Sequence, residues 1–322
     1  MRKTLLAASG IALAMPILLA APPLAHAQGY PTLTPEEAAA QVRRMTDPAD
    51  SPVTGASIFP GVTPINRPPS LEALMAARPG VNPEAGIPEA RAAILRDAGT
   101  TYGAAGGLAA RGYAINEMLR RHEPELDRVY DFRRVVVPLG RGDTLLMPPV
   151  VSEAQMAMAL EQGGQRARTT GRIYRITREA EIVSEPPNWR ALLVQTWPHP
   201  EPPLDQARPK NRDEVKYWEQ VVAEGWALGE TQAVQIFLAK LAALESTLVG
   251  AARYKVLLSA GLVEQPTVTM QFRRVQGGGG VLRLDDTDIE IRRQGGLQAD
   301  PRRWRGTAPV PYGGPIGQPP AR

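Results

Sequence analysis

The sequence predicts an α+β fold in which helices pack with a small antiparallel sheet. Two long stretches, 89–121 and 213–260, place apolar or small residues at helical spacing. Two stretches near the C-terminus, 267–275 and 281–293, alternate apolar with polar residues as half-buried strands do. With 43% hydrophobic residues among 322, the chain can bury a core, and we expect one domain over 89–305.

The N-terminus is typical of an exported protein. Residues 1–27 have a positive start, an apolar stretch over 5–21 and a final Ala-His-Ala, a small-x-small cleavage signal. We expect this signal peptide to be cut between Ala27 and Gln28. An uncleaved membrane anchor is the alternative, but Pro16 interrupts the apolar stretch. No later segment approaches the apolar run of about 20 residues that a spanning helix needs.

Composition limits the chemistry of the exported chain. Cysteine is absent, so we expect no disulfide, no thiol chemistry and no lipid on an N-terminal cysteine. Cleavage would remove Arg2 and Lys3 and lower the formal charge from +4 to +2. Arginines occur in pairs, at Arg120-Arg121, Arg133-Arg134, Arg273-Arg274 and Arg292-Arg293. A DNA-contacting track is one interpretation, but acids are interleaved, and we favour solvated faces without direct nucleic-acid binding.

The segment 28–88 is Pro-rich and is expected to be an extended, poorly packed arm. One short amphipathic helix is predicted within it, at 34–44, where Thr34 can cap the helix and Pro35 suits its first position. The Gly/Pro-rich tail at 306–322 has too little apolar surface to fold, so we expect it to be disordered.

The first long helix contains the run Tyr-Gly-Ala-Ala-Gly-Gly-Leu, with Gly103, Gly106 and Gly107. A phosphate cradle is the functional alternative, but no Gly-Lys-Ser/Thr follows and no strand precedes. We therefore favour close packing of another helix against a face of small residues.

The region between the two long helices has a mixed pattern. We expect a strand at 135–137, a turn at 140–143, a helix at 152–161 capped by Ser152, and one strand or a tight hairpin at 173–183.

A new element begins after two prolines, at Trp189 and Arg190. Trp189 could anchor an interface, since interfaces favour tryptophan and arginine together. It could equally pin its own loop to the core.

The second long helix has one clear apolar face, formed by Trp218, Val222, Trp226, Gly229, Ala233, Ile236, Phe237, Leu241, Leu244 and Leu248. Gly225 and Gly229 each cost about 1 kcal/mol of helix propensity relative to Ala, so they need a close approach by another backbone. A break near Gly250 is expected to divide the stretch into two helices.

Sequence signatures of catalysis and metal binding are missing. After cleavage, His122 and His199 are the remaining histidines, and lone histidines beside charged residues are usually surface groups. The serine-hydrolase and zinc-protease motifs are absent. Residues 285–288 hold three aspartates without the glycine and glutamate of a calcium loop, so a polar β-turn is favoured. We expect no metal, no cofactor and no catalytic residue.

A periplasmic enzyme that cleaves the cell wall is the functional alternative, because glycosidases act through paired carboxylates. The candidates are Glu214, Glu219 and Glu224 on the second long helix, with the tryptophans as sugar platforms. Their spacing of five places them on diverging faces, so they cannot pair without help from elsewhere.

Five separated blocks of sequence carry a family resemblance across about 91–304. They are 98–132 with its Gly-rich run; Pro148-Pro149-Val150-Val151; Pro187-Asn188-Trp189-Arg190-Ala191-Leu192-Leu193; Trp218 with Glu224-Gly225-Trp226 and Gly229-Glu230-Thr231-Gln232-Ala233; and Tyr254, Leu257-Leu258, Val263 and Pro266. In this order they resemble the DotC family of Dot/Icm-type (type IVB) secretion and conjugation systems.

The resemblance implies a structural part of an outer-membrane core complex that helps place a DotH-like subunit at the outer membrane. Its partners would be DotD-like and DotH-like proteins and the DotG-like and DotF-like components, with no small-molecule substrate. Candidates for packing or partner contacts are Gly103, Gly106, Gly107, Pro148, Pro149, Trp189, Arg190, Trp218, Gly225, Trp226, Gly229, Gln232 and Tyr254.

This chain departs from the family pattern in its anchoring. Many members carry an acylated cysteine just after the signal, where this chain has Gln28. We therefore expect a periplasmic protein that reaches the outer membrane through its partners. Leu192 in place of a tyrosine and Glu245 in place of an aspartate are milder differences.

Overall fold

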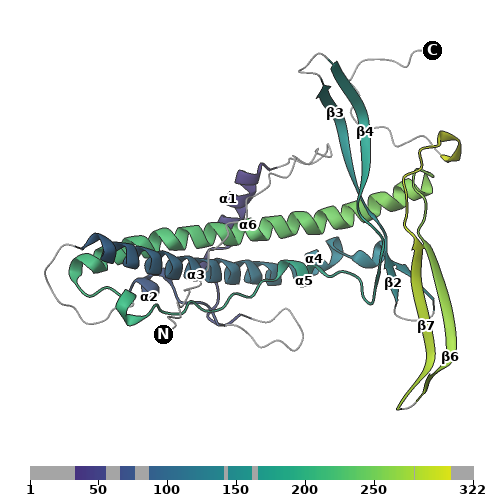
Figure 1. Cartoon of the computed structure of the whole chain (residues 1–322). Helices are drawn as coiled ribbons and strands as arrows, with labels where there is room; N and C mark the ends of the chain where they lie inside the picture. Colours follow the sequence, from purple (N-terminus) through teal and green to yellow (C-terminus); the bar gives the residue numbers. More distant parts are fainter. Residues whose placement is uncertain are drawn as a thin grey trace, which may run out of the picture. The chain divides into compact units, whose positions relative to one another are not determined.

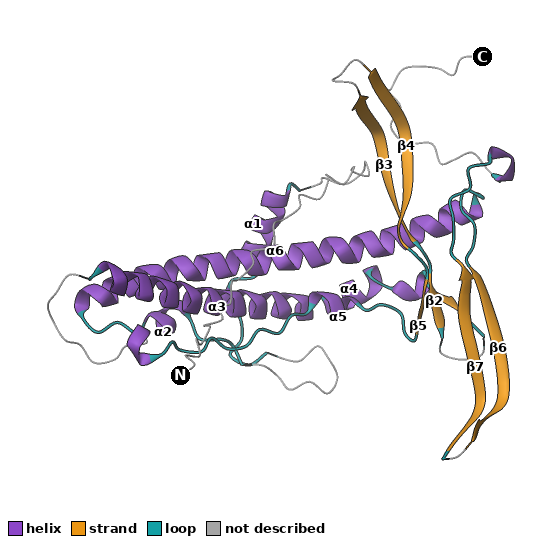
Figure 2. Cartoon of the chain, viewed as in Figure 1, coloured by secondary structure: helices purple, strands orange, loops and turns teal. Residues whose placement is uncertain are grey.

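The computed structural model describes residues 33–55, 66–76, 87–140, 144–161, 166–278 and 280–305. Helices and small sheets occur together, which confirms the predicted α+β class (Figure 1, Figure 2). The chain divides into two compact units, and of the described residues the smaller unit holds Glu153–Ile173 while the larger holds all the others. The expected signal peptide with its cleavage site at Ala27 and Gln28 and the tail from 306 lie outside the described residues.

Two long helices, α3 (Glu89–Arg121) and α6 (Arg212–Ser259), lie side by side in the larger unit (Figure 1). Both predicted helices are confirmed, but the predicted break near Gly250 is wrong because α6 runs through it. A Cβ added to Gly250 would lie 2.4 Å from the Val150 side chain. This glycine therefore admits the start of strand β3 against the helix instead of ending the helix.

The apolar character of α6 is greater than we expected from the sequence. One window of 18 residues has a mean hydropathy of 1.4, so by length and composition α6 could cross a membrane. The core helix of a soluble protein passes the same test, and α6 buries Val234, Phe237 and Leu244 within the larger unit.

The N-terminal arm packs more closely than expected. It contains α1 (Pro35–Met45), the 3-10 turn η1 (Pro48–Asp50) and α2 (Leu71–Met75). Thr34 and Glu37 cap α1 through both halves of a capping box, which confirms the predicted helix. Val42 and Leu74 are buried, so the expectation of poor packing is wrong for these segments. Isolated apolar residues in a Pro-rich sequence give no periodic signal, which is why α2 was missed.

A three-stranded antiparallel sheet lies beyond the end of α3. It is preceded by α4 (Glu123–Val129) and the 3-10 turn η2 (Phe132–Arg134), and its strand order is β1 (Val137–Pro138), β2 (Leu145–Met147) and β5 (Glu181–Val183). The strand predicted at 135–137 overlaps β1 in one residue. Val135 and Val136 instead turn into the core, where both are buried.

Strands β3 (Val150–Glu161) and β4 (Arg166–Arg178) pair in a two-stranded ribbon, so the helix predicted at 152–161 is wrong. This segment is rich in alanine, glutamate and methionine, which favour helix locally. Pairing with β4 overrides that preference, as tertiary context often does. The strand or hairpin predicted at 173–183 is also different, because β4 and β5 belong to two separate sheets.

The chain continues through α5 (Trp189–Leu193) and the 3-10 turn η4 (Asp205–Ala207), and after α6 it forms β6 (Thr267–Gly278), β7 (Val281–Arg293) and the 3-10 turn η5 (Pro301–Arg303). Strands β6 and β7 pair antiparallel and confirm the strands predicted there. The polar turn predicted at 285–288 is wrong, because these residues lie within β7. Gly278, at the end of β6, instead pairs with Val281, at the start of β7.

Candidate functional site

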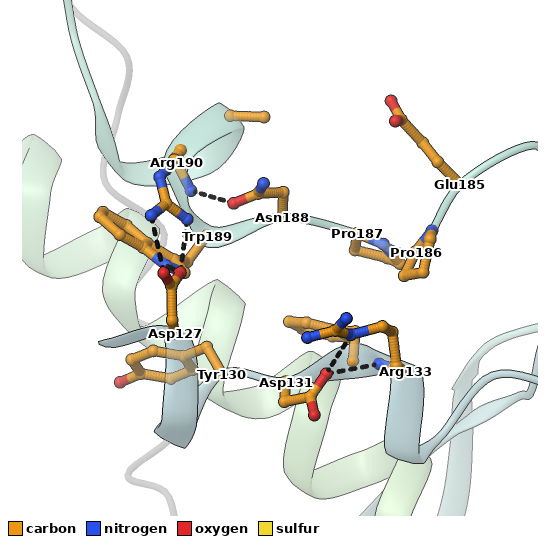
Figure 3. A pocket seen from close by; sticks show the side chains of 12 residues that line it. Asp127, Tyr130, Asp131, Arg133, Glu185, Pro186, Pro187, Asn188, Trp189 and Arg190 are labelled. Atoms are coloured by element: carbon orange, nitrogen blue, oxygen red, sulfur yellow. Dashed lines mark hydrogen bonds and ion pairs between the residues drawn. The ribbon is translucent and has the colours of Figure 1, made fainter. Parts of the chain in front are cut away.

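A cleft of about 590 Å³ opens between the end of α4 and the loop that leads into α5 (Figure 3). One wall comes from Asp127 and from Tyr130 to Arg133, and the other from Glu185 to Ala191. Asn188 shapes the second wall, because its side chain accepts a hydrogen bond of 2.9 Å from the backbone N–H of Arg190 and so starts α5. The cleft contains Trp189 and Arg190, which the sequence had singled out.

Arg190 bridges the two walls of this cleft. Nη1 of its guanidinium donates a hydrogen bond to Asp127 Oδ1 at 2.5 Å, and Nη2 donates one to Asp127 Oδ2 at 2.9 Å. Its Nε donates to Glu123 Oε1 at 3.2 Å, and the same guanidinium lies 4.5 Å from the centre of the Trp189 ring. Glu123 and Asp127 are four residues apart on α4, so both carboxylates project from one face of the helix.

Trp189 is fixed from two sides. Its side chain is 1% exposed in the main core with Phe132 and Leu193. Its indole Nε1 donates to Asp127 Oδ1 at 2.8 Å. Of the two interpretations of Trp189, the geometry supports a tryptophan that pins its own loop to the core.

The charges of this network are stable near neutral pH. The hydrogen bonds between the Arg190 guanidinium and the Asp127 carboxylate shift the pKa values of both groups. They are the main cause that lowers the pKa of Asp127 and the main cause that raises the pKa of Arg190. A carboxylate and a guanidinium held in this way exchange no proton at neutral pH. The network therefore acts as a brace between α4 and α5.

The rim of the cleft remains accessible. Arg133 has a side chain that is 79% exposed and is held by Asp131 at 3.0 Å, while Glu185 is exposed on the opposite wall (Figure 3). Pro186 and Pro187 are half-buried between them. A rigid floor with exposed charges of both signs around it is suited to contact with another protein chain.

The predicted glycines and tryptophans form the contact between α3 and α6. A Cβ added to Gly103 or Gly107 would stand 2.2 Å from a carbonyl oxygen of α6, and one at Gly225 would stand 2.3 Å from a carbonyl oxygen of α3. Gly106 faces the side chains of Leu74 and Trp226. Gly103, Gly107 and Gly225 therefore let the two helix backbones pack together, as predicted.

The remaining candidates lie apart from the cleft. Pro148 and Pro149 are buried between β2 and β3. Tyr254 is buried on α6 and donates its hydroxyl to the Glu264 carbonyl at 3.0 Å, and burial raises the pKa of this tyrosine to about 12. Gln232 is exposed on α6.

Two of the three glutamates considered for a lytic site, Glu214 and Glu224, lie in different surroundings. Glu214 is buried. Its carboxylate accepts a hydrogen bond from Nη2 of Arg91 at 2.9 Å and another from the backbone N–H of Lys210 at 2.8 Å. The hydrogen bond from Arg91 is the main cause that lowers the pKa of Glu214. Glu224 accepts from Gln220 on the exposed side of the helix at 2.9 Å.

Histidines and acids are the side chains that could hold a metal ion here, since the chain has no cysteine. His122 and His199 are both exposed. Within the described ranges, no group of three or more histidine, aspartate or glutamate side chains could hold one.

Sequence reasoning missed one buried ion pair that fixes the arm. Arg111 of α3 is 7% exposed and donates Nη2 to Glu230 of α6 at 2.9 Å. Its Nη1 also donates to the Arg43 carbonyl at 3.0 Å and to the Thr46 carbonyl, at the C-terminal end of α1. The available signal was a lone arginine among small residues, Ala-Ala-Arg-Gly, on a helix face expected to be buried.

The chain matches a known protein family. A family model described as "Type IV secretory system, conjugal DNA-protein transfer" (T4SS_TraI) matches residues 89–306, more than half of the chain. The matched region begins at the first residue of α3, and it includes the cleft and both long helices. A search of the curated proteins found no match.

Proposed function

This chain belongs to the type IV secretory system family of conjugal DNA-protein transfer, and we propose on that basis that it is a non-catalytic, DotC-like subunit of the outer-membrane core complex. The observation that carries the proposal is the family match across residues 89–306, together with the order of the five DotC-like sequence blocks. In this role the chain helps to place a DotH-like subunit at the outer membrane.

The structural positions of those blocks support a scaffold. The Gly-rich block packs α3 against α6, and the block from 187 to 193 braces α5 on α4 through Arg190. Tyr254 ties α6 to the strand region through Glu264. These three blocks thus have packing roles that a non-catalytic subunit needs.

The proposed partners are DotD-like and DotH-like proteins and the DotG-like and DotF-like components that connect toward the inner membrane. We place the chain in the periplasm, held to the outer membrane by these partners, because no cysteine is available for acylation. The rim of the cleft between α4 and α5 is the proposed contact for one of them.

Affinity purification from detergent-extracted cells that carry the complete transfer system tests this function. The tagged chain should bring down large core proteins that span the envelope. Recovery of the chain alone, together with clearing of cell wall in a zymogram, would contradict the scaffold and support the lytic enzyme.

A matched pair of variants tests the rim. Arg133 and Arg134 are both exposed and both contact Asp131, but of the two Arg133 lines the cleft. Arg133→Glu should lower recovery of the core partners about tenfold, the loss of one favourable charge contact of about 1.4 kcal/mol. Arg134→Glu should recover them at the parental level. Equal recovery from both variants would remove the rim from the proposal.

A further inference from the structure

Residues 196–204 lie between α5 and α6 and are rich in proline, so we call them the proline segment. Its prolines are Pro198, Pro200, Pro202 and Pro203. A proline ring fixes its own φ at about −65°, and the residue before a proline is restricted to extended backbone. Covalent geometry alone therefore keeps 197–203 extended. Leu204, with φ of −55° and ψ of 149°, ends the segment in the conformation of a polyproline II helix.

The proline segment is stretched along α3 (Figure 2). Just before it, the backbone N–H of Gln195 donates to Asn116 Oδ1 at 3.2 Å. Just after it, Arg91 Nη2 donates to the Arg208 carbonyl at 2.6 Å. Between residues 91 and 116, α3 rises about 37 Å. The connection spans about the same length when the proline segment is polyproline II and η4 is a 3-10 turn, so it has little slack.

Burial along the proline segment repeats every three residues. Trp197, Pro200 and Pro203 are buried or half-buried. The residues between and after them are exposed: Pro198, His199, Glu201, Pro202 and Leu204. Three residues make one turn of a polyproline II helix, whereas side chains of a strand alternate every two. A Cβ added to Gly112 of α3 would stand 2.4 Å from Cδ1 of Trp197, so the inward row packs on α3 at that point.

The two outward rows present apolar groups and one free acid. Pro198 and Pro202 expose their rings, and Leu204 is 75% exposed. Glu201 is exposed between them, and its carboxylate has no ion-pair partner in the part of the chain that the structure describes. The proline segment holds no lysine or arginine, so it does not attract a polyanion such as nucleic acid.

We propose that the proline segment is a docking ligand for a partner protein whose groove is lined by aromatic side chains and holds a basic residue. The aromatic side chains pack on Pro198, Pro202 and Leu204, and the basic residue pairs with Glu201. Grooves of this kind bind polyproline II segments because the ligand is already rigid and loses little entropy on binding. This surface depends neither on the rim of the cleft nor on the proposed place in the core complex.

Photocrosslinking in cells that carry the complete transfer system tests the proposal. Leu204→p-benzoylphenylalanine should give one crosslinked protein, and mass spectrometry should place the link beside aromatic side chains of that protein. Gln235→p-benzoylphenylalanine, at an exposed position of α6, is the control and should give at least tenfold less of the same product. A Leu204 variant that links to no protein, or that links instead to nucleic acid, lipid or a second copy of this chain, overturns the proposal.

Further substitutions in the Leu204 crosslinking variant decide what the partner recognises. Pro198→Ala combined with Pro202→Ala removes both exposed rings, and Glu201→Arg reverses the charge. Each change should lower the crosslink at least tenfold, while Glu224→Arg, an exposed charge reversal on α6, should leave it at the parental level. Thermal unfolding should show parental stability for all of them, because the altered side chains are exposed. Parental crosslinking from the alanine variant would exclude a proline-binding groove, and parental crosslinking from Glu201→Arg would exclude the basic residue.

Discussion

Gly229 of α6 and Ala104 of α3 lie so close that a Cβ added to the glycine would stand 2.1 Å from the Ala104 carbonyl oxygen. The backbone nitrogen of Leu108 would stand 2.7 Å from that added Cβ. Both neighbours are helix backbone, so no rotamer change can make room. The separation of the two long helices therefore depends on the absence of a side chain at this position.

Replacement of Gly229 by leucine should destabilise the fold. The side chain would overlap the α3 backbone, and overpacking of this kind costs roughly 3 kcal/mol or more. Gly296→Ala is the control, because a Cβ there meets nothing within 4 Å. Thermal and urea unfolding would measure both variants. If Gly229→Leu melts like the parent, the helices are not in this contact, and the glycine face is available for docking.

Replacement of Arg190 by lysine should also lower stability, by about 1–3 kcal/mol. A lysine keeps the charge but cannot bond both oxygens of Asp127 and lie flat on Trp189. Arg133→Lys is the matched control, since its single contact with Asp131 is widely exposed and should contribute little. Urea unfolding would measure both variants, and equal midpoints would show that the brace does not stabilise the fold.

Glu214 should contribute stability that depends on pH. Its folded pKa is lowered, mainly by Arg91, so the contribution is fully present above the unfolded pKa of about 4.3 and is lost as pH falls through the lowered value. The parent should exceed Glu214→Gln in stability above about pH 5, and this difference should shrink toward pH 2. Urea titrations across that range would measure it. A difference that grows on acidification would contradict the Arg91 contact.

No single glutamate of α6 should be required for a chemical step. Glu214→Gln, Glu219→Gln and Glu224→Gln should each leave transfer near the parental rate while the protein stays folded, even though the first variant loses some stability. Transfer frequency between cells, with circular dichroism of the purified variants, would measure this. Complete loss of transfer in one folded and correctly assembled variant would reopen the lytic-enzyme hypothesis.

Anchoring should occur through partners. In cells without the other core components, the chain should fractionate with the soluble periplasm and begin at Gln28. The triple variant Ala25→Leu, His26→Ala and Gln28→Cys creates Leu-Ala-Ala-Cys, a lipoprotein signal, and should move to the membrane fraction in the same cells because added acyl chains give stable attachment. Sedimentation of the unmodified chain with outer membrane in those cells would show direct lipid contact and contradict this account.

The sequence predicted several residues of the candidate site but not the contacts that these residues make with one another. Trp189 and Arg190 stood out because they follow two prolines and match a family motif. Their partners Glu123 and Asp127 lie more than 60 residues earlier in the chain, and no local pattern links the two segments. The sequence therefore left the role of Trp189 open between core and interface, and the burial of its side chain in the structure supports the core role.

Local chemistry determined the elements that form within one segment. Thr34 and Glu37 cap α1 without help from the rest of the chain, and the helical periods of α3 and α6 follow from side chains three and four residues apart. The family resemblance and the α+β class were likewise readable from the sequence. Only the tertiary structure decided that 152–161 is a strand and that α6 continues through Gly250. The first depends on pairing with β4 and the second on the contact with Val150, and such distant contacts leave no mark in local propensity.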